Sequence, residues 1–277
     1  MSAPDATGAV ILARGLGSRM RRAAEGVALD PRQAAAAAAG LKGMIPDAAG
    51  RPFLDHVLSS LADGGVTDVC FVVAPNHEPL LAHYAAHPPK RVQLTWVVQQ
   101  EPKGTADALL AAESWAAGRE VLVLNADNLY PVAAIRALVT LGGPGLVAFD
   151  PVALVRDGNI EAARIASFAI LTLHRDGTLA AIVEKPDPAT LAEATANGTT
   201  PWVSMNLWRV GASVFAACRD VTPSPRGELE LPQAVMLAVQ RGHQLHAVTI
   251  AAPVLDLSRQ DDIAAVATLL ATRECAP

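Results

Sequence analysis

The sequence predicts an α/β protein built on a mostly parallel sheet that is buried on both faces. Short apolar runs recur along the first half of the chain and alternate with segments whose apolar residues repeat at helical spacing. The run at 120–124 is almost wholly apolar, as expected for a central strand covered on both sides. With 277 residues, of which 51% are hydrophobic, the chain is long enough to form a large core.

The first half follows a regular alternation of strands and helices. We expect strands over 9–13, 69–74, 94–99, 120–124 and 145–149, and helices over 52–63, 105–117 and 133–141. This order is typical of parallel sheets with crossover helices. In such sheets ligands bind beyond the carboxyl ends of the strands.

The second half lacks the regular alternation of strands and helices. We expect a hairpin of strands 166–174 and 179–184, a helix over 188–197, a strand over 203–210, a helix over 231–241, a strand over 244–250 and a closing helix over 261–272. This half is predicted to be a lobe joined to the first half, not an independent domain. The chain is therefore divided into a flexible N-terminus, 1–7, and two halves of one domain, 8–150 and 151–277.

Residues 21–41 form an unusual segment. Two arginines precede six consecutive alanines at 34–39, and Gly40 ends the run. Alanine has the highest helix propensity, so we expect a helix here. It either covers the mouth of a site or is an exposed insertion without function, and both alternatives stay open.

Composition excludes several classes of partner. The formal net charge of −5 and the lack of a basic run argue against a nucleic-acid partner. The three cysteines have no paired spacing, which favours reduced, structural thiols in a cytoplasmic protein. The first apolar run is too short for a signal sequence or a membrane span, so we expect no membrane association.

The first predicted strand runs into a glycine-containing loop. Gly15 and Gly17 are followed at once by Ser18 and Arg19. Glycine lets backbone N–H groups approach an anion, and arginine adds a fork of donors. The loop lacks both the Walker pattern and the third glycine of a dinucleotide-binding loop. It therefore predicts phosphate binding of another kind.

Five further motifs follow at the expected ends of strands and helices. They are Q-Q-E-P-K-G-T-A at 99–106, L-N-A-D-N at 124–128, V-E-K-P at 183–186, R-G-E-L-E-L at 226–231 and L-D-L at 255–257. In this order they resemble the nucleotidyltransferase family of sugar-nucleotide pyrophosphorylases, over nearly the whole chain. The resemblance implies a Rossmann-like, mostly parallel mixed sheet between helices, of the nucleotide-diphospho-sugar transferase type.

The resemblance also implies a reaction and its charged residues. The family joins an NTP to a sugar 1-phosphate with Mg²⁺ and releases pyrophosphate. On the matching positions, Arg19 and Lys42 hold the NTP phosphates, while Asp127 and Asp256 hold Mg²⁺. The alternatives are solvated surface cations for the two basic residues, a cap of the following helix for Asp127 and a strand-end turn for Asp256.

The half at 151–277 is expected to bind the sugar phosphate. The resemblance assigns Lys185 to the phosphate and Glu184 to sugar hydroxyls. Ser204 and Asn206 match a sugar-binding segment of the family, in which glycine is usual at the position of Asn206. Asn206 either contacts the sugar or lies in a turn at the edge of the core, and both alternatives stay open. Ala169 also replaces a usual glycine, and Glu228 joins the set, although a carboxylate at a helix N-terminus accounts for it as well.

The half at 8–150 is expected to bind the nucleotide. Gln99 matches the glutamine that reads the base edge, with Gln100 as the alternative if the register shifts by one. Gly104 would permit close approach to the base, while Thr105 contacts the nucleotide or caps the following helix. The complete set is Ala13, Arg14, Gly15, Gly17, Ser18, Gln99, Gly104 and Thr105.

Other functions stay open. Arg14, where the family has a small residue, and the 21–41 segment motivate a non-standard acceptor such as phosphocholine, a phosphonate or an acidic sugar. A catalytically silent, nucleotide-sugar-sensing subunit is opposed by the retained charged residues. A glycosyltransferase would need an Asp-x-Asp pattern, and the first position here is Asn125. The base, the sugar and the oligomeric state, with a homo-oligomer among the alternatives, are not fixed.

Overall fold

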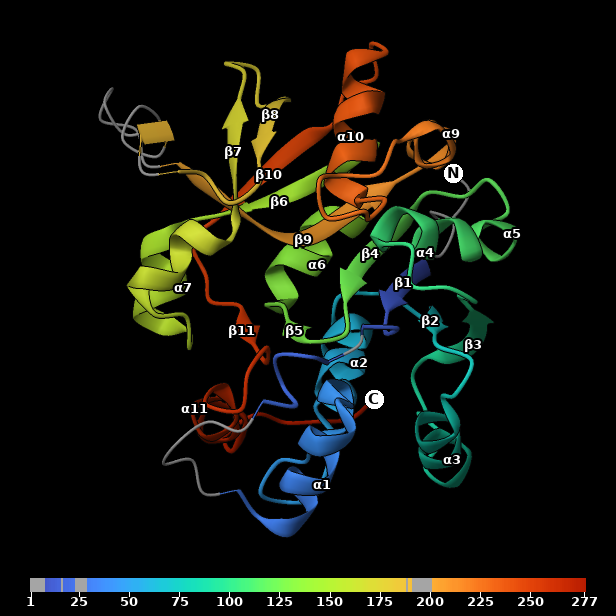
Figure 1. The fold of residues 1–277 in the computed structure, drawn as a ribbon, viewed down its shortest axis with the longest axis vertical. Helices are drawn as coiled ribbons and strands as arrows, with labels where there is room; N and C mark the ends of the chain where they lie inside the picture. Colours follow the sequence, from blue (N-terminus) through green and yellow to red (C-terminus); the bar gives the residue numbers. More distant parts are fainter. Residues whose placement is uncertain (1–7, 16, 23–28, 188, 191–200) are drawn as a thin grey trace.

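The computed structural model describes residues 8–15, 17–22, 29–187, 189–190 and 201–277. It confirms an α/β fold in which a central, mostly parallel sheet lies between helices (Figure 1). The expectations for 1–7 and for most of the helix at 188–197 lie outside the described residues.

Strands from both halves of the chain form one sheet. Its strands are β1 (Gly8–Leu12), β2 (Asp68–Val73), β3 (Gln93–Val98), β4 (Val121–Asn125), β6 (Gly145–Phe149), β7 (Ala169–Leu173), β8 (Leu179–Val183), β9 (Trp202–Val210) and β10 (His246–Ile250). The main path is β10-β6-β9-β4-β1-β2-β3. Strand β9 runs antiparallel to β4 and β6, whereas β1 is parallel to β2 and β4. The sheet is mixed because β9 lies antiparallel between β4 and β6, and because β7 pairs antiparallel with both β8 and β9.

Helices cover both faces of the sheet. They are α1 (Pro31–Ala39), α2 (Phe53–Asp63), α3 (Glu78–Ala86), α4 (Thr105–Ala111), α5 (Glu113–Ala116), α6 (Val132–Val139), α7 (Pro151–Asp157), α9 (Ala212–Asp220), α10 (Leu231–Gln240) and α11 (Asp262–Leu270), with 3-10 helices η1 (Lys42–Met44) and η2 (Ala162–Ser167). The core under α2 and α6 and the core under α4, α9 and α10 lie on opposite sides of the strands.

Some elements differ from their predictions. The single helix expected at 105–117 is two helices, because the chain leaves helical geometry at Ala112. The strand expected from 166 begins at Ala169, because η2 occupies the preceding residues. Helices α3, α7 and α9 were not predicted, although Asp150 and the proline after it are a standard helix start. The apolar residues of α3 are spread around the helix, so no clear period marks it.

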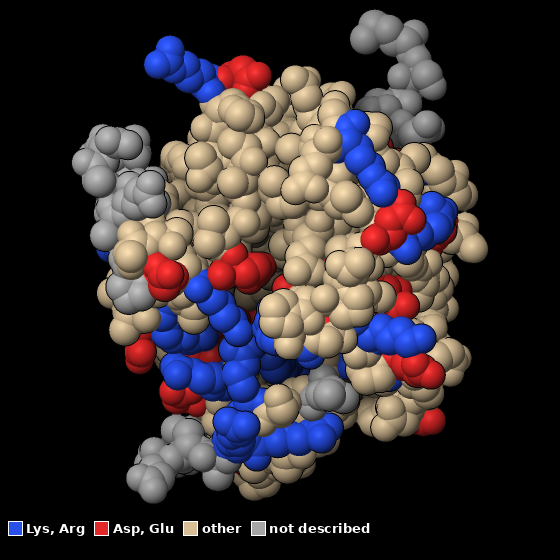
Figure 2. Space-filling model, turned by 45° about the horizontal axis from the view of Figure 1, so that its top comes forward, with Lys and Arg blue, Asp and Glu red and all other residues tan. Residues whose placement is uncertain are grey.

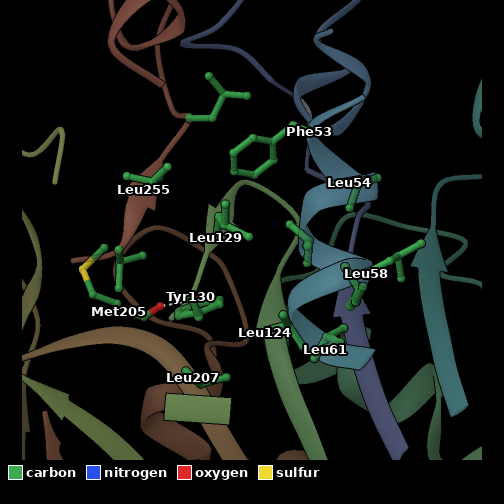
Figure 3. Packing of buried hydrophobic residues seen from close by; sticks show 14 of the residues in the cluster. Phe53, Leu54, Leu58, Leu61, Leu124, Leu129, Tyr130, Met205, Leu207 and Leu255 are labelled. Carbon is green, nitrogen blue, oxygen red and sulfur yellow. Dashed lines mark hydrogen bonds between the residues drawn. The ribbon is translucent and has the colours of Figure 1, made fainter. Parts of the chain in front are cut away.

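The core beside α2 fixes the central strands. Phe53 and Leu58 of α2 pack in the same cluster as Leu124, Tyr130 and Met205 (Figure 3). The hydroxyl of Tyr130, itself buried, donates to the Met205 carbonyl at 2.6 Å. Because an unpartnered buried hydroxyl would be costly, this bond ties the chain after β4 to the middle of β9.

A short antiparallel ribbon joins segments far apart in sequence. Strand β5 (Asn128–Leu129) pairs with β11 (Leu255–Asp256), and Asp256 stands opposite Asn128. The Leu257 N–H donates to the Asp127 carbonyl at 2.8 Å. The Asn159 side chain accepts from the Asp256 N–H and donates to its carbonyl, both at 2.8 Å. This ribbon places Asp127 and Asp256 at one edge of the sheet.

The turn between η1 and α2 is organised by a buried carboxylate. Asp47 accepts from the N–H groups of Ala49 and Arg51 at 2.8 and 2.9 Å, and its Oδ2 lies 3.0 Å from His56 Nε2. Burial alone would raise the pKa of Asp47, but hydrogen bonds from Arg51 and His56 outweigh it, so the pKa is lowered from its ordinary value. The turn fixes the position of η1, which begins at Lys42.

We expect Asp47→Asn to lower the free energy of unfolding at pH 7 by about 2–4 kcal/mol, because several buried donors lose a charged acceptor. Since folding lowers the pKa of Asp47, its stabilisation is present above the unfolded value of about 3.9 and is lost as the pH falls through the folded value. Urea unfolding at pH 7 and pH 3 should show a smaller difference from the wild type at pH 3. Asp157→Asn, at an exposed ion pair, is the control, and an Asp47→Asn protein of wild-type stability would contradict this role.

Candidate functional site

A cleft of about 610 Å³ opens at the carboxyl ends of β1 and β4, between the β7–β8 hairpin, β9 and the start of α10. Figure 2 shows Lys and Arg side chains gathered in one continuous area of this face, although the chain carries a net charge of −5. The sequence-predicted residues that line the cleft are Ser18, Arg19, Thr105, Asp127, Ala169, Glu184, Lys185, Ser204, Asn206, Glu228 and Asp256.

A smaller, mostly apolar cavity of about 100 Å³ adjoins the cleft at Asp127. Ala13, Gly15 and Lys42 line it. The Nζ of Lys42 donates to Asp127 Oδ2 at 2.7 Å, so the pair stands where the two hollows meet. Helix α6 has Pro131, not Asp127, at its N-cap, so the capping alternative for Asp127 is wrong.

Asp256 is buried and its carboxylate is almost fully hydrogen-bonded. Its Oδ1 accepts from Ser258 Oγ at 2.6 Å and from Asn128 Nδ2 at 3.2 Å, and its Oδ2 pairs with Arg164. Burial, together with the negative charge of Asp127, raises the pKa of Asp256 to about 6. The two carboxylates therefore stand close enough to repel each other.

The residues of the cleft fit a divalent cation. Carboxylate oxygens are the ligands that Mg²⁺ prefers, and Mg²⁺ is commonly held by one or two carboxylates together with substrate phosphates. A cation between Asp127 and Asp256 would relieve the repulsion that raises the pKa of Asp256. Within the described part of the chain, no group of three or more His, Cys, Asp or Glu side chains could hold a metal ion. Phosphate oxygens or water would therefore complete the shell.

Two residues of the cleft have left-handed backbone geometry. Lys185 has a φ of 45° and Asn206 a φ of 58°. Asparagine tolerates this region better than most residues, which explains why Asn206 can stand where glycine is usual. Lysine does not, and strain of this kind is typically found at functional sites. The backbone thus supports a functional position at Lys185, whereas the geometry of Asn206 is ordinary for asparagine.

Two charged residues that were not in the predicted set, Arg226 and Glu230, also line the cleft, and both act on the predicted residue Glu184. Glu184 is accessible in the cleft, yet surrounding protein displaces enough water to raise its pKa, and the charge of Glu230 adds to this. Arg226 donates to Glu230 from Nε at 3.1 Å and opposes the shift. Helix α10 begins at Leu231 with Glu230 at its N-cap, so Glu228 lies just before the helix N-terminus, as the sequence predicts. The G-E-x-E motif itself was the available signal for Glu230.

Part of the predicted nucleotide-binding set lies away from both hollows. Arg14, Gly17, Gln99 and Gly104 line neither the cleft nor the smaller cavity. Arg14 donates from Nε to the Gln99 carbonyl at 2.8 Å. The side-chain nitrogen of Gln99 is buried and donates to Asp107 at 2.7 Å and to the Gly104 carbonyl at 3.0 Å. Both amide hydrogens of Gln99 are thereby engaged within the protein, while Gln100 is exposed.

The backbone explains Gly104 and Thr105 differently from the prediction. Gly104 has a φ of 123°, and a Cβ there would lie 2.3 Å from the Leu229 carbonyl oxygen. The close approach is therefore to Leu229. Thr105 Oγ1 accepts from the Leu231 N–H at 2.8 Å, so Thr105 caps α10 and not its own helix, whose N-cap is Gly104.

The alanine-rich segment forms a capped, exposed helix. The Asp30 carboxylate and the Gln33 side chain form a capping box at the start of α1, and Gly40 ends it in left-handed geometry. Ala37 is buried, but no residue of α1 lines either hollow. These findings favour the exposed insertion over a helix at the site mouth. A Cβ on Gly17 would lie 2.4 Å from the Gly40 oxygen, so the glycine loop packs on the end of this helix.

Fold and cleft together define an α/β protein with a charged ligand-binding cleft at the carboxyl edge of its sheet. The chain belongs to the nucleotidyl transferase family, because the sequence model of that family matches residues 37–253, more than half of its length. No described helix is long and apolar enough to cross a membrane.

Individual relatives agree with this family. The chain is 26% identical over 265 residues to the UTP–glucose-1-phosphate uridylyltransferase AglF of Haloferax volcanii, covering 92% of each protein. It is 25% identical to a glucose-1-phosphate thymidylyltransferase of Streptomyces antibioticus, over 73% of this chain and 52% of that protein. It spans 44% of the bifunctional protein GlmU of Methanococcus maripaludis, at 26% identity.

A solved structure shares the fold. A crystal structure of UDP-glucose pyrophosphorylase complexed with UDP-glucose superposes with a TM-score of 0.72 and covers 95% of this chain and 97% of that one. The sequence identity is 14%, so the likeness shows the fold alone.

We expect Gly104→Ala to lower the free energy of unfolding by about 3 kcal/mol, because left-handed strain adds to a clash with the Leu229 backbone. Gly118→Ala is the matched control, since Gly118 also has a positive φ, of 79°, but open space around it. There the loss should be about 1 kcal/mol. Urea unfolding compares the two variants, and equal losses would show that the contact with Leu229 is not tight.

Proposed function

We propose that the chain transfers a nucleotidyl group from an NTP to a sugar 1-phosphate and releases pyrophosphate. The observation that carries this proposal is the convergence of Asp127 and Asp256 with basic residues from both halves of the chain on one cleft. A lone carboxylate at the end of a buried strand is costly unless a cation compensates it. Two of them beside Arg19 and Lys185 suit a reaction that brings two polyanions together.

The chemistry requires positioning and charge neutralisation more than acid–base catalysis. An oxygen of the sugar phosphate attacks the α-phosphorus, and the bond from that phosphorus to the bridging oxygen of the β-phosphate breaks as pyrophosphate leaves. In-line geometry and stabilised charge on the equatorial oxygens supply most of the rate enhancement. We assign Arg19 and Lys42 to the NTP phosphates and Lys185 to the sugar phosphate. No nucleophilic side chain is needed.

Mg²⁺ held by Asp127 and Asp256 would neutralise phosphate charge and orient the α-phosphate. The Asp127 carboxylate also holds Lys42, whose side chain is largely covered, so the ammonium group is positioned before substrate arrives. Pre-organised charge of this kind costs no reorganisation during reaction. Lys42 and Asp127 are thus proposed to act as one unit at the phosphate end of the cleft.

The two halves are proposed to divide the substrates. Residues 8–150 would bind the nucleotide through the loop holding Ala13, Gly15 and Ser18, which lines both hollows. Residues 151–277 would bind the sugar through hydroxyl contacts to Glu184, Ser204, Asn206 and Glu228. Ala169 adds a methyl group to the same wall. Gln99 and Gly104 would act by shaping the loop at 99–106.

The comparisons do not favour the other functions considered. Two relatives, which match 92% and 73% of this chain, are named for glucose 1-phosphate, not for phosphocholine or phosphonates. A silent subunit would not need Arg19, Lys185 and both aspartates facing the cleft.

Pyrophosphate release, measured with Mg²⁺ over a panel of NTPs and sugar 1-phosphates, tests the proposal. We expect one base and one class of sugar to be preferred, and Asp127→Asn to lower the rate at least about a hundredfold, because phosphate charge loses its cation and Lys42 its partner. Asp157→Asn, at an exposed pair outside the cleft, should keep wild-type activity. Folded wild-type protein that releases no pyrophosphate with any pair would contradict the proposal.

A further inference from the structure

An arginine that no motif indicated stands at the proposed metal site. Arg164 lies in η2, lines the cleft and has a side chain only 12% exposed. Its guanidinium bridges two buried carboxylates, with NH1 donating to Asp262 Oδ1 at 2.6 Å and NH2 donating to Asp256 Oδ2. Asp262 is itself held, because its Oδ2 accepts from the N–H groups of Ser258 and Arg259 at 3.0 and 2.8 Å.

Arg164 leaves Asp256 little capacity for another ligand. Each carboxylate oxygen can accept about two hydrogen bonds. The Oδ1 of Asp256 already accepts from Ser258 and Asn128, and Oδ2 accepts from Arg164. A cation on Oδ2 would have to share that oxygen with a guanidinium, and the two positive charges repel.

Asp127, the other proposed metal ligand, is also paired with a basic side chain. Asp127 pairs with Lys42 as Asp256 pairs with Arg164. Arginine does not lose its proton in proteins, so its competition with a metal ion persists at every accessible pH. In the protein without substrate, each of the two carboxylates thus has an internal counter-ion.

We propose that Arg164 is a positioning residue that acts as the counter-ion of Asp256 and competes with the divalent cation for it. The inference rests on the proposed function for the assignment of Asp256. Competition keeps the affinity for the bare cation low. An arriving polyphosphate adds oxygen ligands for the cation and offers the displaced guanidinium new acceptors in the cleft. The metal therefore binds tightly only together with the nucleotide.

Mn²⁺ binding to the nucleotide-free protein, measured by calorimetry on wild type and Arg164→Met, tests this. An arginine beside a carboxylate lowers that group's affinity for a proton by about ten- to a thousandfold, and a metal ion meets the same repulsion. We expect Arg164→Met to bind Mn²⁺ at least about tenfold more tightly than wild type. Arg164→Lys keeps a positive charge beside Asp256, although not the bridge to Asp262, and should gain clearly less Mn²⁺ affinity than Arg164→Met.

Arg209→Met is the matched control. Arg209 is also largely covered, with a side chain 15% exposed, and pairs with Glu120, but neither residue lines the cleft. This variant should lose stability without gaining Mn²⁺ affinity. If Arg164→Met is too unstable for calorimetry, its Tm with and without Mn²⁺ gives the same comparison. Mn²⁺ should raise that Tm more than the Tm of wild type or Arg209→Met.

Unchanged Mn²⁺ affinity in Arg164→Met, no Tm rise with Mn²⁺, or an equal gain in Arg164→Lys would overturn the inference. Wild-type pyrophosphate release separates this failure from that of the proposed function. An active wild type with no gain in Arg164→Met refutes the role of Arg164 alone. If Arg164→Met gains Mn²⁺ affinity but the wild type releases no pyrophosphate, the competition between Arg164 and the metal is supported and the proposed reaction is refuted.

Discussion

The antiparallel pairing of β5 with β11 decides where the charges of the cleft stand. It joins residues 127–129 to 255–257 through main-chain hydrogen bonds, and it places the Asp127 and Asp256 carboxylates on one edge of the sheet. The Asp256 carboxylate is buried and would be costly there without a partner, while Asp127 is partly exposed. Lys42 of η1 pairs with Asp127 and Arg164 of η2 with Asp256, so the two 3-10 helices supply the compensating charges at this edge.

The glycines and the threonine near the cleft make close contacts with the main chain of other segments. Gly17 lets the glycine-containing loop after β1 lie on Gly40, just before η1, while Gly104 lets the chain before α4 lie on Leu229, just before α10. Thr105 then caps α10. The first contact lies beside η1, which lines the smaller cavity, and the second lies beside α10, which lines the cleft. The site is therefore held by close main-chain packing, and its side chains are positioned before a ligand binds.

The fold followed from the sequence where local patterns are strong. The buried strands β1, β2, β4 and β6 lie within a residue or two of their predicted bounds, because apolar runs between turn residues admit few alternatives. Most charged residues of the cleft were found because they sit in short motifs, although Arg226 and Glu230 were passed over within one of these motifs. Arg164 has no motif, and its role depends on Asp256 and Asp262, some ninety residues away. The internal bonds of the Gln99 amide could not be predicted for the same reason, because Asp107 engages it in a contact that only the folded chain shows.

Locating the cation directly tests whether Asp127 and Asp256 form one metal site. The measurement is a crystal structure with Mn²⁺ and a non-reacting NTP analogue, in which anomalous scattering identifies the metal. We expect one Mn²⁺ ion bound by both carboxylates and by phosphate oxygens, with the Arg164 guanidinium moved away from Asp256 Oδ2. An Mn²⁺ ion bound elsewhere, or a nucleotide–Mn²⁺ complex in the cleft with the Arg164–Asp256 pair intact and Asp256 unligated, would contradict the shared site.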